Sequence, residues 1–75
     1  MKGVIVIGEK IGNNLFIEAV EFPDRSRRTT HFVEHRREEN LYGMWRDCYT
    51  VYFDDDIKTP VKLYQMQNGM WLLDV

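Results

Sequence analysis

The sequence has 75 residues, of which 44% are hydrophobic and 13% aromatic, and its formal net charge is −2 at pH 7. A chain of this length forms one domain, residues 1–75, and buries only about 60% of the surface that its unfolded state exposes. The single cysteine, Cys48, excludes an internal disulfide, which favours a reducing, cytoplasmic location. The apolar run Val4 to Ile7 is too short for a secretory signal, which needs roughly 7–15 apolar residues, or for a membrane span of about 20.

The N-terminal third predicts a hairpin. Residues 3–11 are β-branched and apolar, residues 12–14 (Gly-Asn-Asn) are typical of a turn, and residues 15–22 continue as a second strand. In that second strand Leu15, Ile17 and Ala19 share one face. Pro23 ends the strand because proline cannot donate a hydrogen bond to a neighbouring strand.

The middle of the chain gives a weaker pattern. Residues 29–33 and 48–53 favour strands through β-branched and aromatic side chains. Residues 34–40 are polar and predict a helical turn or a long loop, since the apolar residues within 31–46 do not form a helical stripe. Residues 54–56 (three aspartates) and Thr59-Pro60 predict a turn before the last hairpin.

The C-terminal segment carries the strongest local signal. Residues 61–66 alternate along a strand, Asn68-Gly69 predicts a two-residue type I′ turn, and residues 71–75 form the last strand. Five or six short strands must curl to protect their edges. The predicted fold class is therefore mostly β, as a small curled antiparallel sheet or an SH3-like or OB-like barrel.

Several motifs resemble catalytic or metal sites but lack the context that the chemistry needs. Residues 31–35 spell H-x-x-E-H, which binds zinc on a helix, whereas these residues favour a strand. A structural zinc site prefers four Cys or His ligands, and the chain holds only His31, His35 and Cys48. The glycines at 8 and 12 lack the middle glycine of a dinucleotide loop. The aspartates at 54–56 are consecutive rather than alternate, as a calcium loop requires.

No nucleophile and base pair stands out either. Cys48 lies in a predicted strand with nothing beside it to lower the pKa of its thiol, which favours a small buried side chain. The prediction is a protein that is not an enzyme, with no catalytic residue, no metal ligand and no cofactor.

The arginines and aromatics favour a binding function. All six arginines lie between positions 25 and 46, where they meet five acids, so residues 24–47 carry a net charge of +1. Arginine, tyrosine and tryptophan are enriched at the energetic centres of protein interfaces. We therefore expect a protein-binding module, or a small inhibitor or regulator of a larger cytosolic protein with an acidic surface. Such self-contained chains are common in phages and mobile elements. The predicted partner-binding residues are Arg36, Arg37, Tyr42, Trp45 and Arg46.

A second hypothesis is a small barrel that binds single-stranded RNA or DNA. Such barrels stack bases on exposed aromatics and hold phosphates with basic side chains. The predicted contacts are Arg25, Arg27, Arg28, Tyr49 and Tyr52. The isoelectric point near 5.6 argues against it, because nucleic-acid-binding domains are usually basic. The sequence also allows a homodimer through the last strand, residues 71–75, as an unprotected sheet edge.

Overall fold

The computed structural model describes residues 2–74, and these residues form strands and turns without a helix. All strand pairs are antiparallel, in the sheet order β1-β7-β6-β5-β4-β3-β2. The β-rich fold class predicted from the sequence is confirmed. The seven strands are β1 (Lys2–Gly3), β2 (Ile5–Ile11), β3 (Asn14–Glu21), β4 (Arg27–Glu39), β5 (Trp45–Phe53), β6 (Asp56–Gln65) and β7 (Trp71–Leu73).

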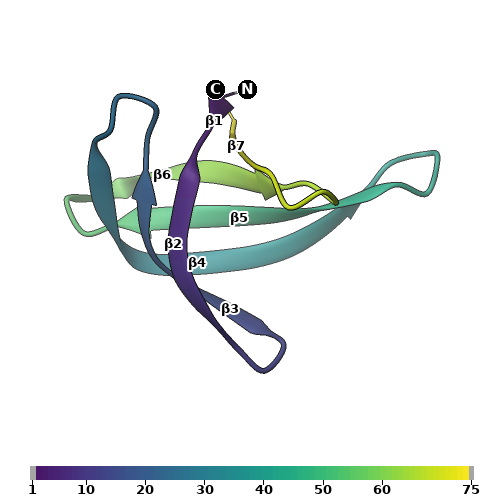
Figure 1. Ribbon diagram of the computed structural model, residues 1–75, viewed down its shortest axis with the longest axis horizontal. Coiled ribbons are helices and arrows are strands. Elements are labelled where there is room, and N and C mark those ends of the chain that lie inside the picture. Colours follow the sequence, from purple (N-terminus) through teal and green to yellow (C-terminus); the bar gives the residue numbers. More distant parts are fainter. Residues whose placement is uncertain (1, 75) are drawn as a thin grey trace.

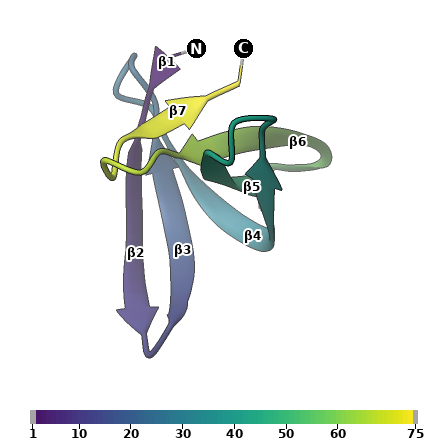
Figure 2. The ribbon, with the colours of Figure 1, turned by 90° about the vertical axis from the view of Figure 1, so that its right-hand side faces the viewer.

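The sheet curls into a half-barrel because its two end strands are adjacent in the chain (Figures 1 and 2). β1 and β2 are separated only by Val4, whose N–H donates to the carbonyl of Trp71 at 3.2 Å. β1 pairs with β7, whereas β2 pairs with β3. This division of the first strand explains why the structure has seven strands where five or six were predicted.

The last strand is not an open edge. β7 lies between β6 and β1, so the prediction that this strand leaves its edge free is wrong for Leu72 and Leu73. Val75 lies outside the described residues. The N-terminal strand covers this edge, because β1 passes beside β7 before the chain bends into β2.

β4 extends much further than the sequence predicts. Residues 34–39 are strand and not a helical turn or a long loop. Arginine and glutamate have low strand propensity, but here they pair across the hairpin with opposite charges. Arg37 lies opposite Asp47, and Glu38 lies opposite Arg46. Such cross-strand pairs stabilise a sheet by roughly 0.2–1 kcal/mol each, which sequence propensity alone does not reveal.

The N-terminal hairpin contains a close backbone contact at Gly8. The register of β2 and β3 shifts between Ile7 and Gly8, where the strand pairing becomes irregular. A Cβ atom at Gly8 would collide with the carbonyl oxygen of Phe16. Only glycine fits this approach of two backbones, so Gly8 serves the fold rather than a phosphate loop.

β6 begins earlier than predicted. The turn comprises residues 54 and 55, and Thr59-Pro60 lies inside the strand rather than in a turn. Val51 of β5 pairs with Val61, but Phe53 pairs with Asp56, so residues 57–60 of β6 bulge out of register. Pro60 is tolerated there because the bulge does not require its missing N–H.

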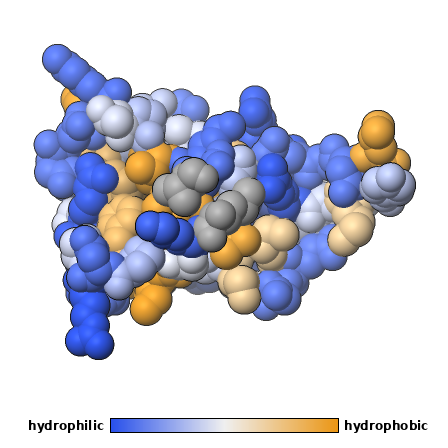
Figure 3. Space-filling model, turned by 90° about the horizontal axis from the view of Figure 1, so that it is seen from above, coloured by the Kyte–Doolittle hydropathy of each residue, from blue (hydrophilic) through white to orange (hydrophobic). Residues whose placement is uncertain are grey.

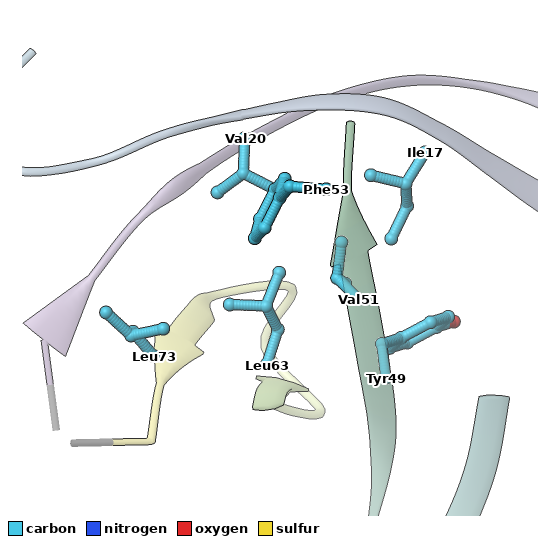
Figure 4. Packing of buried hydrophobic residues seen from close by; sticks show 7 residues of the cluster. All are labelled: Ile17, Val20, Tyr49, Val51, Phe53, Leu63 and Leu73. Atoms are coloured by element: carbon cyan, nitrogen blue, oxygen red, sulfur yellow. The ribbon is translucent and has the colours of Figure 1, made fainter. Parts of the chain in front are cut away.

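The core lies on the inner side of the half-barrel (Figure 4). Val20, Val51, Phe53 and Leu63 are completely buried. They belong to a cluster whose members come from β3, β5, β6 and β7: Ile17, Val20, Tyr49, Val51, Phe53, Leu63 and Leu73. Ile17 and Ala19 are buried and Leu15 is half-buried, as expected for the inner face, but Val20, which strict alternation places on the opposite face, is completely buried. The register shift between β2 and β3 skips Glu18 and breaks the alternation there.

Residues 2–74 contain no helix that is long and apolar enough to cross a membrane.

Candidate functional site

The hairpin formed by β4 and β5 projects from the body of the protein (Figure 1). Its turn carries Leu41, Tyr42, Gly43 and Met44 to one end of the molecule. Figure 3 shows hydrophobic residues at this projecting end, beyond a stretch that is largely hydrophilic. The end of the hairpin is the candidate functional site.

Four apolar side chains are exposed here, and we call them the tip patch: Leu41, Tyr42, Met44 and Trp45. Leu41 is 100% exposed, Tyr42 88% and Met44 58%, while Trp45 is 38% exposed. Single exposed apolar residues are common on proteins, but contiguous ones mark interaction surfaces. The tip patch holds four exposed apolar residues within positions 41–45, which makes it the candidate site.

The backbone of this turn is held rigidly. The N–H of Asn40 donates to the carbonyl of Met44 at 2.8 Å, and the N–H of Gly43 donates to the carbonyl of Asn40 at 3.2 Å. The Asn40 side-chain oxygen accepts from the N–H groups of Tyr42 and Met44 at 2.9 and 3.1 Å. Gly43 has a φ of 76°, which glycine adopts without steric cost.

The turn between β6 and β7 has the same backbone pattern. The N–H of Met66 donates to the carbonyl of Met70, and the N–H of Gly69 donates to the carbonyl of Met66, both at 2.9 Å. Gly69 has a φ of 87°, whereas Asn68 is not in the left-handed region. The type I′ turn predicted from Asn68-Gly69 is therefore wrong, and a three-residue loop with glycine in its last position forms instead.

A third turn, between β3 and β4, repeats the pattern without glycine. Phe22 makes the equivalent two hydrogen bonds with Ser26 and Arg25, and Arg25 has a φ of 69°. The first two loop residues are Pro23 and Asp24, which are typical turn formers.

A comparison of these equivalent turns shows which side chains the backbone conformation of the turn requires. The first two loop positions hold Gln67 and Asn68 in one turn, and Pro-Asp in another, but Leu41 and Tyr42 in the projecting hairpin. The same backbone forms with polar residues at these positions. The exposed leucine and tyrosine are therefore not required by the turn.

A shallow hollow of about 300 Å³ lies beside the tip patch. It is lined by apolar and charged side chains from both arms of the hairpin and from the neighbouring turn: Glu38, Glu39, Asn40, Met44, Trp45, Arg46 and Met66. Hydrophobic residues next to a few polar groups are the usual composition of a recognition surface. The hollow extends the exposed surface from the tip toward the body.

The predicted partner-binding residues lie on both faces of the hairpin. Arg37 has its guanidinium 4.0 Å from the centre of the Trp45 ring, and its Nε lies 3.3 Å from an Asp47 oxygen. Arg46 lies over the Tyr64 ring at 3.8 Å. Arg36 is exposed and forms no ion pair with another residue in the range 2–74.

The alternation of a strand explains this separation. Arg37 and Trp45 share one face of the hairpin. Arg36 and Arg46 occupy the other face, while Tyr42 lies in the turn. The five predicted residues therefore do not form one surface, and the apolar tip is the feature that both faces share.

The arginines predicted to contact nucleic acid are placed differently from one another. Arg28 donates three hydrogen bonds to Asp55, the shortest at 2.7 Å, and its guanidinium lies 4.1 Å from the centre of the Phe53 ring. Its guanidinium therefore seals the edge of the core. Arg27 lies 3.9 Å from Glu21, and Arg25 is exposed in its turn.

Tyr49 is not available to stack on a base. It is buried, with His35 stacked at a centroid distance of 4.6 Å and Trp71 tilted at 5.0 Å. Burial raises the pKa of its phenol, and the Asp47 charge adds to this. The prediction for Tyr49 as an exposed stacking residue is therefore wrong, whereas Tyr52 is half-buried beside Phe32.

The histidines do not meet Cys48. His31 Nδ1 lies 3.0 Å from Asp54, and His35 Nε2 lies 2.8 Å from Asp47. No group of three or more metal-ligating side chains occurs among residues 2–74. Cys48 is buried, and burial raises the pKa of its thiol, so the side chain behaves as a small apolar residue.

Leu41 and Met44 are functional candidates that the sequence prediction did not select. The signal is present in the sequence, because two large apolar residues precede a turn glycine where polar residues are usual. The polar residues 34–40 predict either a helical turn or a loop, so the sequence does not locate the turn itself. Comparisons with protein-family models, curated proteins and solved structures give no match for this chain.

Proposed function

We propose that this chain is a non-enzymatic protein-binding module that inhibits or regulates a larger partner, and that the tip patch inserts into an apolar pocket of that partner. The observation that carries the proposal is the presence of Leu41 and Tyr42, 100% and 88% exposed, where the equivalent β6–β7 turn holds the polar residues Gln67 and Asn68. The half-barrel, of SH3-like or OB-like type in this proposal, serves as the rigid base for the hairpin.

The tip patch can supply the energy for such a contact. Burial of apolar surface stabilises a complex by roughly 25 cal/mol per Å². The two Asn40 hydrogen bonds and Gly43 fix the turn before binding. A rigid contact surface loses little conformational entropy on association, which leaves more of the burial energy for affinity.

The arginines extend this surface toward an acidic partner. Arg36 is exposed, and its charge is free to steer the approach of negative groups. Trp45 is covered on one side by the Arg37 guanidinium, which presents a cation and an aromatic ring together. Arg37 therefore borders the tip patch at Trp45 and would contact the rim of the partner's pocket.

The proposal is tested by affinity capture from host lysate at moderate salt, with and without nuclease, followed by quantitative mass spectrometry. The wild type is compared with the double variant Leu41→Gln/Tyr42→Asn, which introduces the residues of the equivalent β6–β7 turn. The matched control is Ile57→Ser/Met70→Ser, because these residues are also exposed but lie elsewhere.

We expect one stoichiometric protein that survives nuclease and is captured at least tenfold less by the tip variant, but equally by the control. Equal capture by both variants would contradict the assignment to the tip patch. Loss of all capture after nuclease would favour the single-stranded RNA or DNA hypothesis, with Arg25 and Arg27 as the next residues to substitute.

A further inference from the structure

The sheet is split between β3 and β4. The two strands pair only at three positions, from Ala19–Thr29 to Glu21–Arg27. Beyond this point β3 and β4 diverge (Figure 2). Within residues 2–74, β3 from 14 to 18 is paired only with β2, and β4 from 30 to 39 only with β5. Each strand therefore presents an unpaired edge to the split.

The split holds an apolar hollow of about 560 Å³, which we call the β3–β4 groove. Both strands contribute to its lining, together with Tyr49 from β5: Asn14, Leu15, Phe16, Ile17, Thr30, His31, Phe32, Val33, His35 and Tyr49. Phe16 and Phe32 are 53% and 54% exposed and come from opposite walls. A groove with aromatic walls and unpaired strand edges matches the geometry that binds an extended peptide as an added strand.

One end of the groove is positively charged. A second hollow of about 330 Å³ shares Asn14, Leu15, His35 and Tyr49 with the groove, so the two are continuous. This hollow adds two cations, Lys10 and Arg37, and one acid, Asp47.

The negative charge of Asp47 is already balanced by a cation within the protein, Arg37. Its Oδ1 lies 2.8 Å from His35 and 3.3 Å from Arg37, and its side chain is largely buried. The end of the groove therefore has an excess of one positive charge, carried by Lys10, before any protonation of His35. A carboxylate on the ligand would complement it.

We propose that the β3–β4 groove binds an extended peptide segment that carries alternate apolar side chains followed by an acidic residue. The apolar side chains lie between Phe16 and Phe32, the peptide backbone pairs with the free edge of β4, and the carboxylate meets Lys10. This site is separate from the tip patch, so it does not rest on the proposed function.

The probe is a random dodecapeptide library displayed on phage and selected on the intact protein. Enriched peptides are synthesised with a fluorescent label, and their affinity is measured by fluorescence anisotropy. The variants are Phe32→Thr for the apolar wall and Lys10→Gln for the charged end. The matched controls are Ile57→Thr and Lys58→Gln, which change equally exposed residues outside the groove.

We expect a consensus of alternating apolar residues followed by an acid, at least tenfold weaker binding to Phe32→Thr, and severalfold weaker binding to Lys10→Gln. Amide hydrogen exchange in β4 between 31 and 35 should slow in the complex at alternate residues, because the N–H groups on the free edge gain partners while the others already face β5. The absence of a consensus, a consensus without an acid, or unchanged exchange would each overturn the proposal. Circular dichroism of Phe32→Thr separates loss of binding from loss of fold.

The tip variant tests the groove proposal independently of the proposed function. Leu41→Gln/Tyr42→Asn should bind the selected peptide as tightly as the wild type does. A tenfold loss in this tip variant would place the peptide at the hairpin end and overturn the groove assignment.

Discussion

The turn at residues 40–44 and the turn at residues 66–70 have the same backbone conformation but carry different side chains. Both close with the same pair of backbone hydrogen bonds and both place glycine at a positive φ in the last loop position. The turn at 66–70 has the polar residues Gln67 and Asn68 at its first two loop positions, whereas the turn at 40–44 has the exposed residues Leu41 and Tyr42 there. The comparison shows that the glycine and the backbone hydrogen bonds serve the fold, whereas the fold does not require Leu41 and Tyr42, to which we assign the proposed recognition role.

The first prediction gives the loss of stability expected when a core residue is truncated. Phe53 is completely buried in the core, and Arg28 packs against its ring. Phe53→Ala should lower the free energy of unfolding by about 3–5 kcal/mol through lost burial and the cavity left behind. Urea denaturation followed by tryptophan fluorescence measures this loss. A loss below about 1 kcal/mol would show that the core does not close around Phe53.

The second prediction tests whether the two turns have the same backbone. Gly43→Ala and Gly69→Ala each place a Cβ atom on a left-handed residue, which costs roughly 1–2 kcal/mol. Neither Cβ meets a close neighbour, so the cost arises from the backbone alone. The two losses in unfolding free energy should be equal, and a difference of more than about 1 kcal/mol would break the equivalence of the turns.

The third prediction distinguishes the turns by their asparagines. Asn40 accepts two backbone hydrogen bonds, from Tyr42 and Met44, whereas Asn68 accepts one, from Met70. Since one such bond contributes about 0.5–1.5 kcal/mol, Asn40→Ala should destabilise the protein more than Asn68→Ala does. Thermal unfolding of both variants gives the order. The reverse order would mean that the projecting turn is not held more firmly.

The fourth prediction concerns a turn whose tip is charged. The Arg28 hydrogen bond lowers the pKa of Asp55 below its ordinary value of 3.8. The ionised Asp55 therefore stabilises the folded state above pH 3.8, and this contribution is lost as the pH falls toward the lowered pKa. Asp55→Asn should make the loss of stability below pH 3.8 less steep. Identical acid unfolding curves for the variant and the wild type would contradict this role.

The sequence predicted the elements whose signal is local. The apolar alternation of residues 15–20 and the β-branched run at 48–53 are sufficient to identify β3 and β5. The buried cysteine was also predictable, since nothing beside it in sequence activates its thiol. These features depend on side-chain type and period rather than on distant partners.

The features that depend on pairing were not predictable. The strand at 34–39 requires opposite charges on β5, and the bend at Val4 requires β7 as a partner for β1. The burial of Tyr49 depends on His35 and Trp71, which are distant in sequence. The exposure of the tip follows from the same pairing, because it was the extended β4 that fixed where the turn lies.

The most direct test of the recognition role exchanges the residues of the two turns. The variant Leu41→Gln/Tyr42→Asn and its reciprocal, Gln67→Leu/Asn68→Tyr, are compared for unfolding free energy and for capture of the protein partner. We predict that the first variant retains the wild-type stability within about 0.5 kcal/mol and loses at least tenfold in capture. The reciprocal variant loses the hydrogen bond from the Met70 N–H to the Asn68 side chain, so it should be less stable by about 0.5–1.5 kcal/mol but retain capture. Destabilisation of the first variant by several kcal/mol, or capture at the wild-type level, would contradict a recognition role for Leu41 and Tyr42.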